Sequence, residues 1–265
     1  MHRVGHVGRA AIRLLIVGCV LVTDHLAAAQ PVAPPAAGPA SAPAGGLAPK
    51  RIKSLEPTTD DIPVAAWLYP LPEGASPLAT VLLVPDLKGS HQTVEPLAKA
   101  LQSGGCTVVA VDLRGHGDSK HPRAMSAEDD PTKLLRTEDY AMIAATAEGR
   151  MRDQAGVRGD IECVRAWIKR ETDAGTIPRA PLVVVGSGLG GSLCAKWTIA
   201  DAAWPDTTKG PQGGDVAGLV LVSPPLVAKG LRMQALLGLE PVATKVPVMV
   251  VAGHVASLGP FGGVG

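Results

Sequence analysis

The sequence has 265 residues and a formal net charge of +1, and charged residues make up 18% of it. This balance gives no electrostatic footprint for nucleic acid, so we expect no nucleic-acid partner. Aromatic residues amount to only 3%, which argues against sugar-binding and base-stacking platforms because both need aromatic faces. With 46% hydrophobic residues, the chain can bury a sizeable core.

Residues 1–29 have the three parts of a secretory signal peptide: a basic start, an apolar stretch over residues 14–22, and small residues just before Gln30. The apolar stretch is shorter than the roughly 20 residues that span a bilayer, so an uncleaved anchor is the weaker alternative. A lipid anchor at Cys19 is a second alternative. We therefore expect a periplasmic or extracellular protein with no transmembrane span once the leader is removed.

Residues 30–61 are predicted to form a Pro/Ala-rich linker. Residues 31–49 consist almost entirely of Pro, Ala and Gly, and such a segment cannot bury enough apolar surface to fold. It reads as an extended tether. The folded domain is then expected to occupy residues 62–265.

From residue 62 onward, β-rich runs alternate with helical patterns. We expect strands at residues 64–69, 79–84, 107–112, 181–186, 217–222 and 246–252. We expect helices at residues 93–101, around 161–168 and at 192–203. Because parallel strands need crossover connections, this alternation predicts a doubly wound, mostly parallel sheet with helices on both faces, in three α/β/α layers. Residues 120–157 are polar and are expected to be an insertion or cap with a short helix near residues 140–148.

The main motif is a glycine-rich corner that follows the apolar run at residues 183–185. It reads Gly186, Ser187, Gly188, Leu189 and Gly190. In the G-x-S-x-G nucleophile elbow, a strand turns sharply into a helix and the central residue presents its side chain to the pocket. Here Gly186 and Gly190 fill the outer positions, and Gly188 stands at the centre.

A second motif, V-x-V-D-x-R-G-x-G-x-S, occupies residues 109–119. With the elbow, it makes the chain resemble the α/β-hydrolase superfamily over roughly residues 62–254. The resemblance implies the fold of that superfamily, and it places Asp86 and Leu87 in the oxyanion-loop region. It says little about a substrate, because one fold hosts many activities.

The family's catalytic positions are not filled in this sequence. The resemblance implies a nucleophile at Gly188, and acids near Ala256 or Ser223, where none stands. The family's histidine lies beyond a further strand, whereas this sequence stops at Gly265, so the fold is expected to lack its last strand and helix. Loss of the nucleophile alone can lower turnover on the order of 10⁶-fold in a serine-hydrolase triad.

Two residues could take over a catalytic role. Ser187 is the hydroxyl nearest to the tip, although it precedes the tip and should point away from the pocket. His254 could act as a base, although a solvated loop histidine is the simpler interpretation. We expect His91 to be a solvated histidine at a helix start and His116 to be structural. A carboxylate at Asp86 would oppose a developing oxyanion, or else would cap the next turn.

We expect neither a metal nor a cofactor. Cys106, Cys163 and Cys194 have no metal-ligand spacing and form no disulfide framework. Buried free thiols are the expected state, and a bridge between Cys163 and Cys194 is the alternative.

The sequence thus predicts an exported α/β-hydrolase-like protein that is catalytically inactive and acts by binding a ligand or a partner. The helix that begins near Gly190 offers free N–H groups, which suit a small carbonyl or anionic ligand in the remnant pocket. An empty, water-filled remnant is an equal alternative, and nothing indicates a particular protein partner. Two other functions stay open: an esterase- or lipase-type serine hydrolase with a displaced nucleophile such as Ser187, and a truncated, non-functional homologue.

Overall fold

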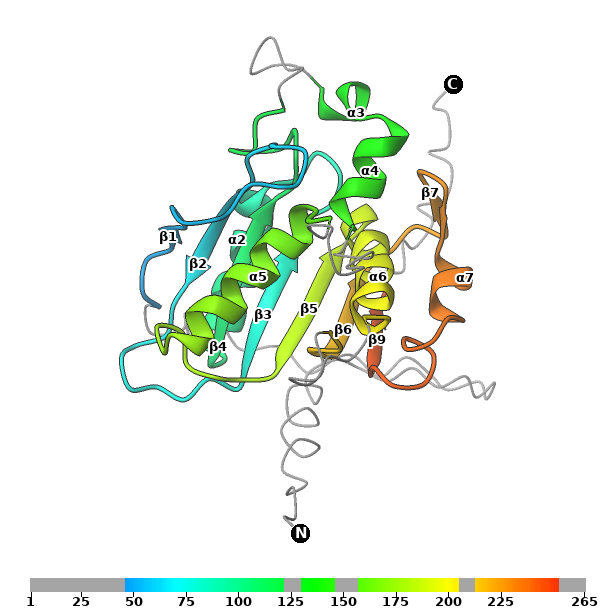
Figure 1. The fold of residues 1–265 in the computed structure, drawn as a ribbon. Coiled ribbons are helices and arrows are strands. Elements are labelled where there is room, and N and C mark those ends of the chain that lie inside the picture. The colour runs from blue at the N-terminus through cyan, green and yellow to red at the C-terminus, as the bar shows by residue number, and fades with distance from the viewer. Residues whose placement is uncertain (1–45, 122–129, 146–156, 205–212, 253–265) are drawn as a thin grey trace, which may run out of the picture.

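The computed structural model describes residues 46–121, 130–145, 157–204 and 213–252 (Figure 1). The predicted signal peptide, most of the Pro/Ala-rich segment, Cys19 and His254 lie outside these residues. None of the helices in the described ranges is long and apolar enough to cross a membrane.

The centre of the domain is a seven-stranded sheet in the order β1-β2-β4-β3-β5-β6-β9. Its strands are β1 (Lys50–Arg51), β2 (Ala65–Tyr69), β3 (Ala79–Val84), β4 (Cys106–Asp112), β5 (Leu182–Ser187), β6 (Val216–Val222) and β9 (Val248–Val251). The five strands from β4 to β9 in this order run parallel, and β2 and β1 continue the sheet antiparallel. Every residue of β3 and β4 is buried, which explains why both strands are apolar apart from Thr80, Thr107 and Asp112.

Helices cover both faces of the sheet (Figure 1). The helices are α2 (His91–Ser103), α5 (Asp160–Asp173) and α6 (Leu189–Ala202). Val94 and Ala98 of α2 pack with Val108 and Ala110 of β4 on one face. The larger core lies on the other face, under α5 and α6. The predicted doubly wound α/β/α architecture is therefore confirmed.

Short elements lie above the end of the sheet at which the parallel strands finish and beside α6 (Figure 1). They are α3 (Pro131–Leu134), α4 (Thr137–Ile143), α7 (Met233–Leu237) and a hairpin of β7 (Val227–Ala228) and β8 (Leu231–Arg232). The helix α4 begins three residues earlier than the sequence predicts, because Asp139 accepts a hydrogen bond from the N–H of Arg136 and caps the first turn. It lies within the expected cap.

The packed part of the chain begins before residue 62. Lys50 and Arg51 pair with β2, and Ile52 is buried in the larger core. Thr58 is also buried, and its hydroxyl bridges a turn by donating to the carbonyl of Ile62 at 2.9 Å. The last part of the segment that reads as linker therefore contributes an edge strand and a folded arm to the domain.

Candidate functional site

The glycine-rich corner lies where the central strand β5 passes into α6. Gly188 has φ 52° and ψ −126°, a left-handed conformation that strains any residue with a side chain. Its N–H donates to the carbonyl of Val222 at 2.8 Å, and its carbonyl accepts from the N–H of Gly191 at 3.0 Å. The corner therefore has the sharp strand-to-helix geometry of a nucleophile elbow, and its tip carries no side chain.

The two outer glycines are required by close backbone approach. A Cβ on Gly186 would lie 2.6 Å from the Cα of Gly191, in the first turn of α6. A Cβ on Gly190 would collide with the carbonyl oxygen of Pro85, just after β3. These glycines hold the start of α6 against the ends of β3 and β5, so the N–H groups of the helix start face the loop after β3.

The Asp86 side chain occupies the space in front of the tip. Its Oδ1 accepts a hydrogen bond from the N–H of Leu189 and another from the N–H of Leu87, both at 2.7 Å. A Cβ built on Gly188 would overlap the Asp86 carboxyl group. The carboxylate therefore fills the volume in which a side chain at the tip would lie.

These two N–H groups are the ones that an acyl-transfer site of this geometry needs. In a nucleophile elbow, the oxyanion hole consists of the N–H after the nucleophile and an N–H from the loop after the third strand. Leu189 and Leu87 stand at these positions, so the loop prediction and the elbow prediction meet at one point in space. Both donors are bound to a full negative charge, which leaves no place for a developing oxyanion.

The three histidines in the described ranges are held by other groups. The Nδ1 of His91 lies 2.9 Å from Oδ2 of Asp112, and its ring stacks on Trp67 with centroids 4.3 Å apart. His91 is 8% exposed, so it is not the solvated residue that the sequence suggested. The reason is that Asp112 also accepts from the backbone N–H of His91, at 2.5 Å, and draws the helix start inward.

The other two histidines are buried around β4 as well. The Nδ1 of His116 lies 2.9 Å from the carbonyl oxygen of Arg114, which fits the expected structural role. The Nε2 of His121 lies 3.4 Å from Oδ1 of Asp139. These partners of the three histidines, Asp112, Arg114 and Asp139, lie outside the elbow. His254 lies outside these residues.

Ser187 ends β5 and is half-buried. Val183 and Val185 pack on the α2 face of the sheet, and alternation along the strand puts the Ser187 side chain on that same face, away from α6. Ser223 follows β6, is exposed, and has a left-handed φ of 47°. It stands one residue beyond Val222, the acceptor of the Gly188 N–H.

A buried ionic cluster anchors α4 near the end of β4. The Arg114 guanidinium is fully buried and donates to Asp160 at 2.7 Å and to Asp60 at 2.6 Å, and Asp139 of α4 lies 3.7 Å away. Burial opposes the charge of Arg114, but Asp160 and Asp60 outweigh it and raise the pKa of the guanidinium. Burial also raises the pKa of Asp160, against the opposing effect of Arg114. The cluster fixes α4 and the N-terminal arm on the end of β4.

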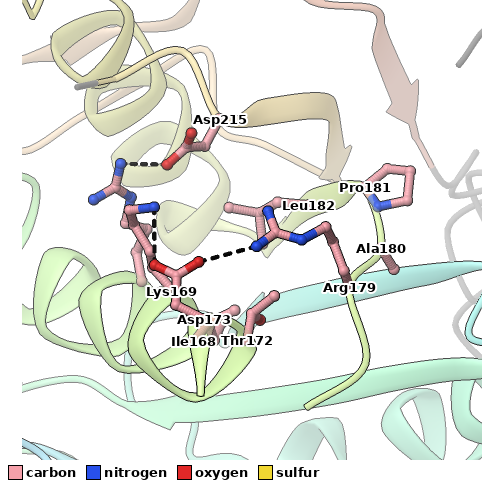
Figure 2. A pocket seen from close by; sticks show the side chains of 10 residues that line it. Ile168, Lys169, Thr172, Asp173, Arg179, Ala180, Pro181, Leu182 and Asp215 are labelled. Carbon is pink, nitrogen blue, oxygen red and sulfur yellow. Dashed lines mark hydrogen bonds and ion pairs between the residues drawn. The ribbon is translucent and has the colours of Figure 1, made fainter. Parts of the chain in front are cut away.

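A separate pocket lies at the opposite end of β5 (Figure 2). It has a volume of about 170 Å³ and is lined by α5 and by the residues that lead into β5 and β6. Its charged side chains are already paired: Asp173 binds Lys169 at 3.3 Å and Arg179 at 3.1 Å, and Arg165 binds Asp215. Because it is far along the strand from the tip, this pocket is no part of the elbow site.

No group of three or more His, Cys, Asp or Glu side chains in the described ranges is placed to hold a metal ion. Cys106, Cys163 and Cys194 are buried free thiols, so the alternative bridge between Cys163 and Cys194 is absent. Burial raises the pKa of Cys163 to about 12, which keeps it in the unreactive thiol form.

A model of the alpha/beta hydrolase family matches residues 81–261, which include the oxyanion loop, the elbow and β9. The chain belongs to the alpha/beta hydrolase family. No curated protein matches the sequence.

Several solved alpha/beta hydrolase structures are similar to the chain. A carboxyl esterase from Bacillus coagulans in complex with glycerol is 14% identical, with a TM-score of 0.43, and the match covers 67% of this chain and 44% of that one. An alpha/beta hydrolase from Novosphingobium aromaticivorans is 20% identical (TM-score 0.37; 66% and 43% covered), and a Pyrococcus furiosus esterase is 16% identical (TM-score 0.38; 64% and 50% covered). The chain thus spans about half the length of these proteins or less.

The sequence indicated the elbow and the loop but not the contact between them. Asp86 was recognised as a carboxylate in the oxyanion loop, yet its bond to Leu189 links residues 103 positions apart. One signal was available: a carboxylate in this loop together with a glycine at the elbow tip. Each of these residues departs from a catalytic site, and the Asp86 carboxyl group occupies the space that the missing side chain of Gly188 leaves.

Proposed function

We propose that this family member is exported and is not a catalyst of acyl transfer, and that it acts through binding. The observation that carries the proposal is Gly188, which places only hydrogen atoms at the elbow tip. Nucleophilic catalysis needs a hydroxyl, thiol or carboxylate on an activated residue at that point. A protein that keeps the fold without the reacting atom can still present its surface to a ligand or a partner.

The esterase alternative needs a displaced nucleophile, and the geometry supports it poorly. Alternation along β5 puts the Ser187 side chain on the α2 face with Val183 and Val185, and the N–H pair that would stabilise an acyl-transfer intermediate is bonded to Asp86. A fluorophosphonate probe, which reacts with activated serines, tests this directly on the full chain. We expect no labelling above that of the heat-denatured protein.

Peptide mapping makes the result specific. Labelling of Ser187 or Ser223 in the folded protein, lost in the matching Ser→Ala variant, would overturn the non-catalytic proposal. Labelling equal in folded and denatured protein would support it. The export part is tested separately, by the mass of the product recovered outside the cytoplasm, which we expect to begin at Gln30.

A ligand for the remnant pocket that the sequence predicts at the elbow belongs to the same proposal. A small carbonyl or anionic compound suits the free N–H groups of a helix start, but here those of Leu87 and Leu189 already have an acceptor. Such a ligand therefore competes with Asp86, and the nature of that competition determines what the site can bind.

A further inference from the structure

We propose that the N–H pair of Leu87 and Leu189 is a carboxylate-binding site that the protein keeps filled with its own Asp86 side chain, and that it accepts a small external monocarboxylate only when Asp86 withdraws. The proposal deepens the proposed function and rests on it, because an active acyl-transfer site would need the same N–H pair empty. We call the Asp86 contact with this pair the latch.

The first argument concerns the N–H groups at the start of α6, which need hydrogen-bond acceptors. Leu189 is the first residue of α6, and the first N–H groups of a helix have no acceptor within the helix. The N–H of Gly191 donates to the carbonyl of Gly188 at 3.0 Å, whereas the N–H of Leu189 donates to Asp86 at 2.7 Å. The latch therefore supplies an acceptor that α6 lacks, at the positive end of its dipole.

The second argument is steric. The Asp86 carboxyl group lies where a Cβ of residue 188 would be, so the latch can close only if glycine stands at the tip. The glycine and the carboxylate are thus one arrangement rather than two independent changes. Any side chain at residue 188 would push the carboxylate off the N–H pair.

The third argument is that the carboxylate is accessible. Asp86 is an exposed residue, and its Oδ1 makes both backbone hydrogen bonds. The loop that carries it is held to the start of α3 by an exposed ion pair between Lys88 and Asp130, at 3.0 Å. Exposed pairs of this kind contribute about 1 kcal/mol or less, so withdrawal of Asp86 needs no break in the core.

Amide hydrogen exchange of the full chain, measured by NMR, tests the latch. In Asp86→Ala, we expect the Leu189 N–H to exchange on the order of tenfold faster than in the wild type, because its acceptor is gone. Asp86→Asn keeps an acceptor oxygen and should retain part of the protection. The N–H of Gly191 is the internal control and should not change, and Glu73→Ala controls for the loss of one exposed carboxylate.

Acetate then tests the site itself. Added to Asp86→Ala, acetate should slow exchange at Leu87 and Leu189 in a saturable way, while chloride at equal ionic strength should not. In the wild type, acetate should change neither amide. The proposal is overturned if Leu189 keeps its protection in Asp86→Ala, or if acetate fails to restore that protection.

A measurement on the wild type covers the case in which Asp86→Ala does not fold. A coupling across the hydrogen bond from the Leu189 nitrogen to the Asp86 side-chain carbon would show the latch directly, and its absence would refute it. These outcomes are independent of probe labelling. A labelled serine would refute the non-catalytic proposal even with the coupling present, and an absent coupling would refute the latch even if no serine is labelled.

Discussion

Replacement of Gly188 by serine should destabilise the protein in two ways, and one of them should disappear when Asp86 is removed. The serine side chain strains a backbone at φ 52°, which costs about 1–3 kcal/mol. It also displaces the Asp86 carboxylate from its two N–H donors. Because Asp86 is exposed, we take the pair of bonds to contribute only about 1–2 kcal/mol.

The two substitutions should therefore not be additive. Gly188→Ser alone should lower the free energy of unfolding by about 2–5 kcal/mol, and Asp86→Ala alone by about 1–2 kcal/mol. The double variant should lose no more than Gly188→Ser alone, since the same hydrogen bonds cannot be lost twice. The sum of the single effects should then exceed the double effect by about 1–2 kcal/mol.

Equilibrium urea unfolding of the four proteins at one pH measures this cycle, and equal slopes in urea would show that the unfolded states are comparable. Gly188→Ala is the matched variant, because it has the same Cβ without a hydroxyl that could form new bonds. Effects of distant sites add within about 0.5 kcal/mol. If the Gly188 and Asp86 effects add to that accuracy, the carboxylate does not occupy the space of a side chain at residue 188.

Three other outcomes follow from the packing around the site. Burial raises the pKa of Glu162 from its ordinary 4.5 to about 7, so the folded state holds this proton more tightly than the unfolded chain does. The free energy of unfolding should therefore fall by up to about 3 kcal/mol as pH rises from about 4.5 to 7. Glu162→Gln should reduce that fall, measured by urea unfolding at pH 5 and pH 8, and an unchanged pH profile would contradict the prediction. Arg114→Ala leaves Asp160 buried without its cation and should lower the free energy of unfolding by about 3–5 kcal/mol. The double variant Arg114→Ala, Asp160→Asn should lower it by less in the same assay. Gly186→Ala places a Cβ 2.6 Å from a backbone carbon and should lower the unfolding midpoint, while Gly218→Ala in β6, with 3.9 Å of room, should not; equal effects would argue against the tight elbow.

Most of the fold could be predicted because its strands are buried on both faces. The run at residues 79–84 was predicted with the observed bounds, and the other strands of the parallel core differ by one or two residues at one end or at both. A strand in the middle of a parallel sheet must be apolar throughout, and that pattern is plain in sequence. The strand β1 has no such pattern, since Lys50 and Arg51 are exposed, and its pairing with β2 depends on backbone groups that composition does not reveal.

Helix starts were harder to place where polar or glycine-rich residues form them. The first turn of α6 contains Gly190 and Gly191, which have low intrinsic helix propensity, so the sequence put the start at residue 192 rather than Leu189. Tertiary contact decides instead, because only glycines allow this turn to lie against the residues after β3. The start of α2 at His91 depends in the same way on Asp112, a residue of another strand.

The candidate site shows the same division between local and long-range information. The turn at Gly188 and the oxyanion loop are each local motifs, and each could be found in the sequence. Whether the loop carboxylate points outward, caps its own turn or crosses to α6 depends on a distance of a few ångströms between segments far apart in the chain. Those few ångströms decide between an N–H pair open to a substrate and one that is already bonded.

Two features that a catalytic elbow requires, a strained tip and unpaired N–H groups, lower stability, and this chain has neither. A catalytic elbow holds a strained side chain at its tip and leaves two N–H groups to be bonded by the reacting substrate. Here the tip is glycine, which accepts the left-handed backbone readily, and the N–H groups bond Asp86. The strain and the unpaired donors are both relieved by one pair of residues, Gly188 and Asp86. A serine introduced at residue 188 alone should therefore meet the Asp86 carboxylate in the space that its substrate would have to occupy.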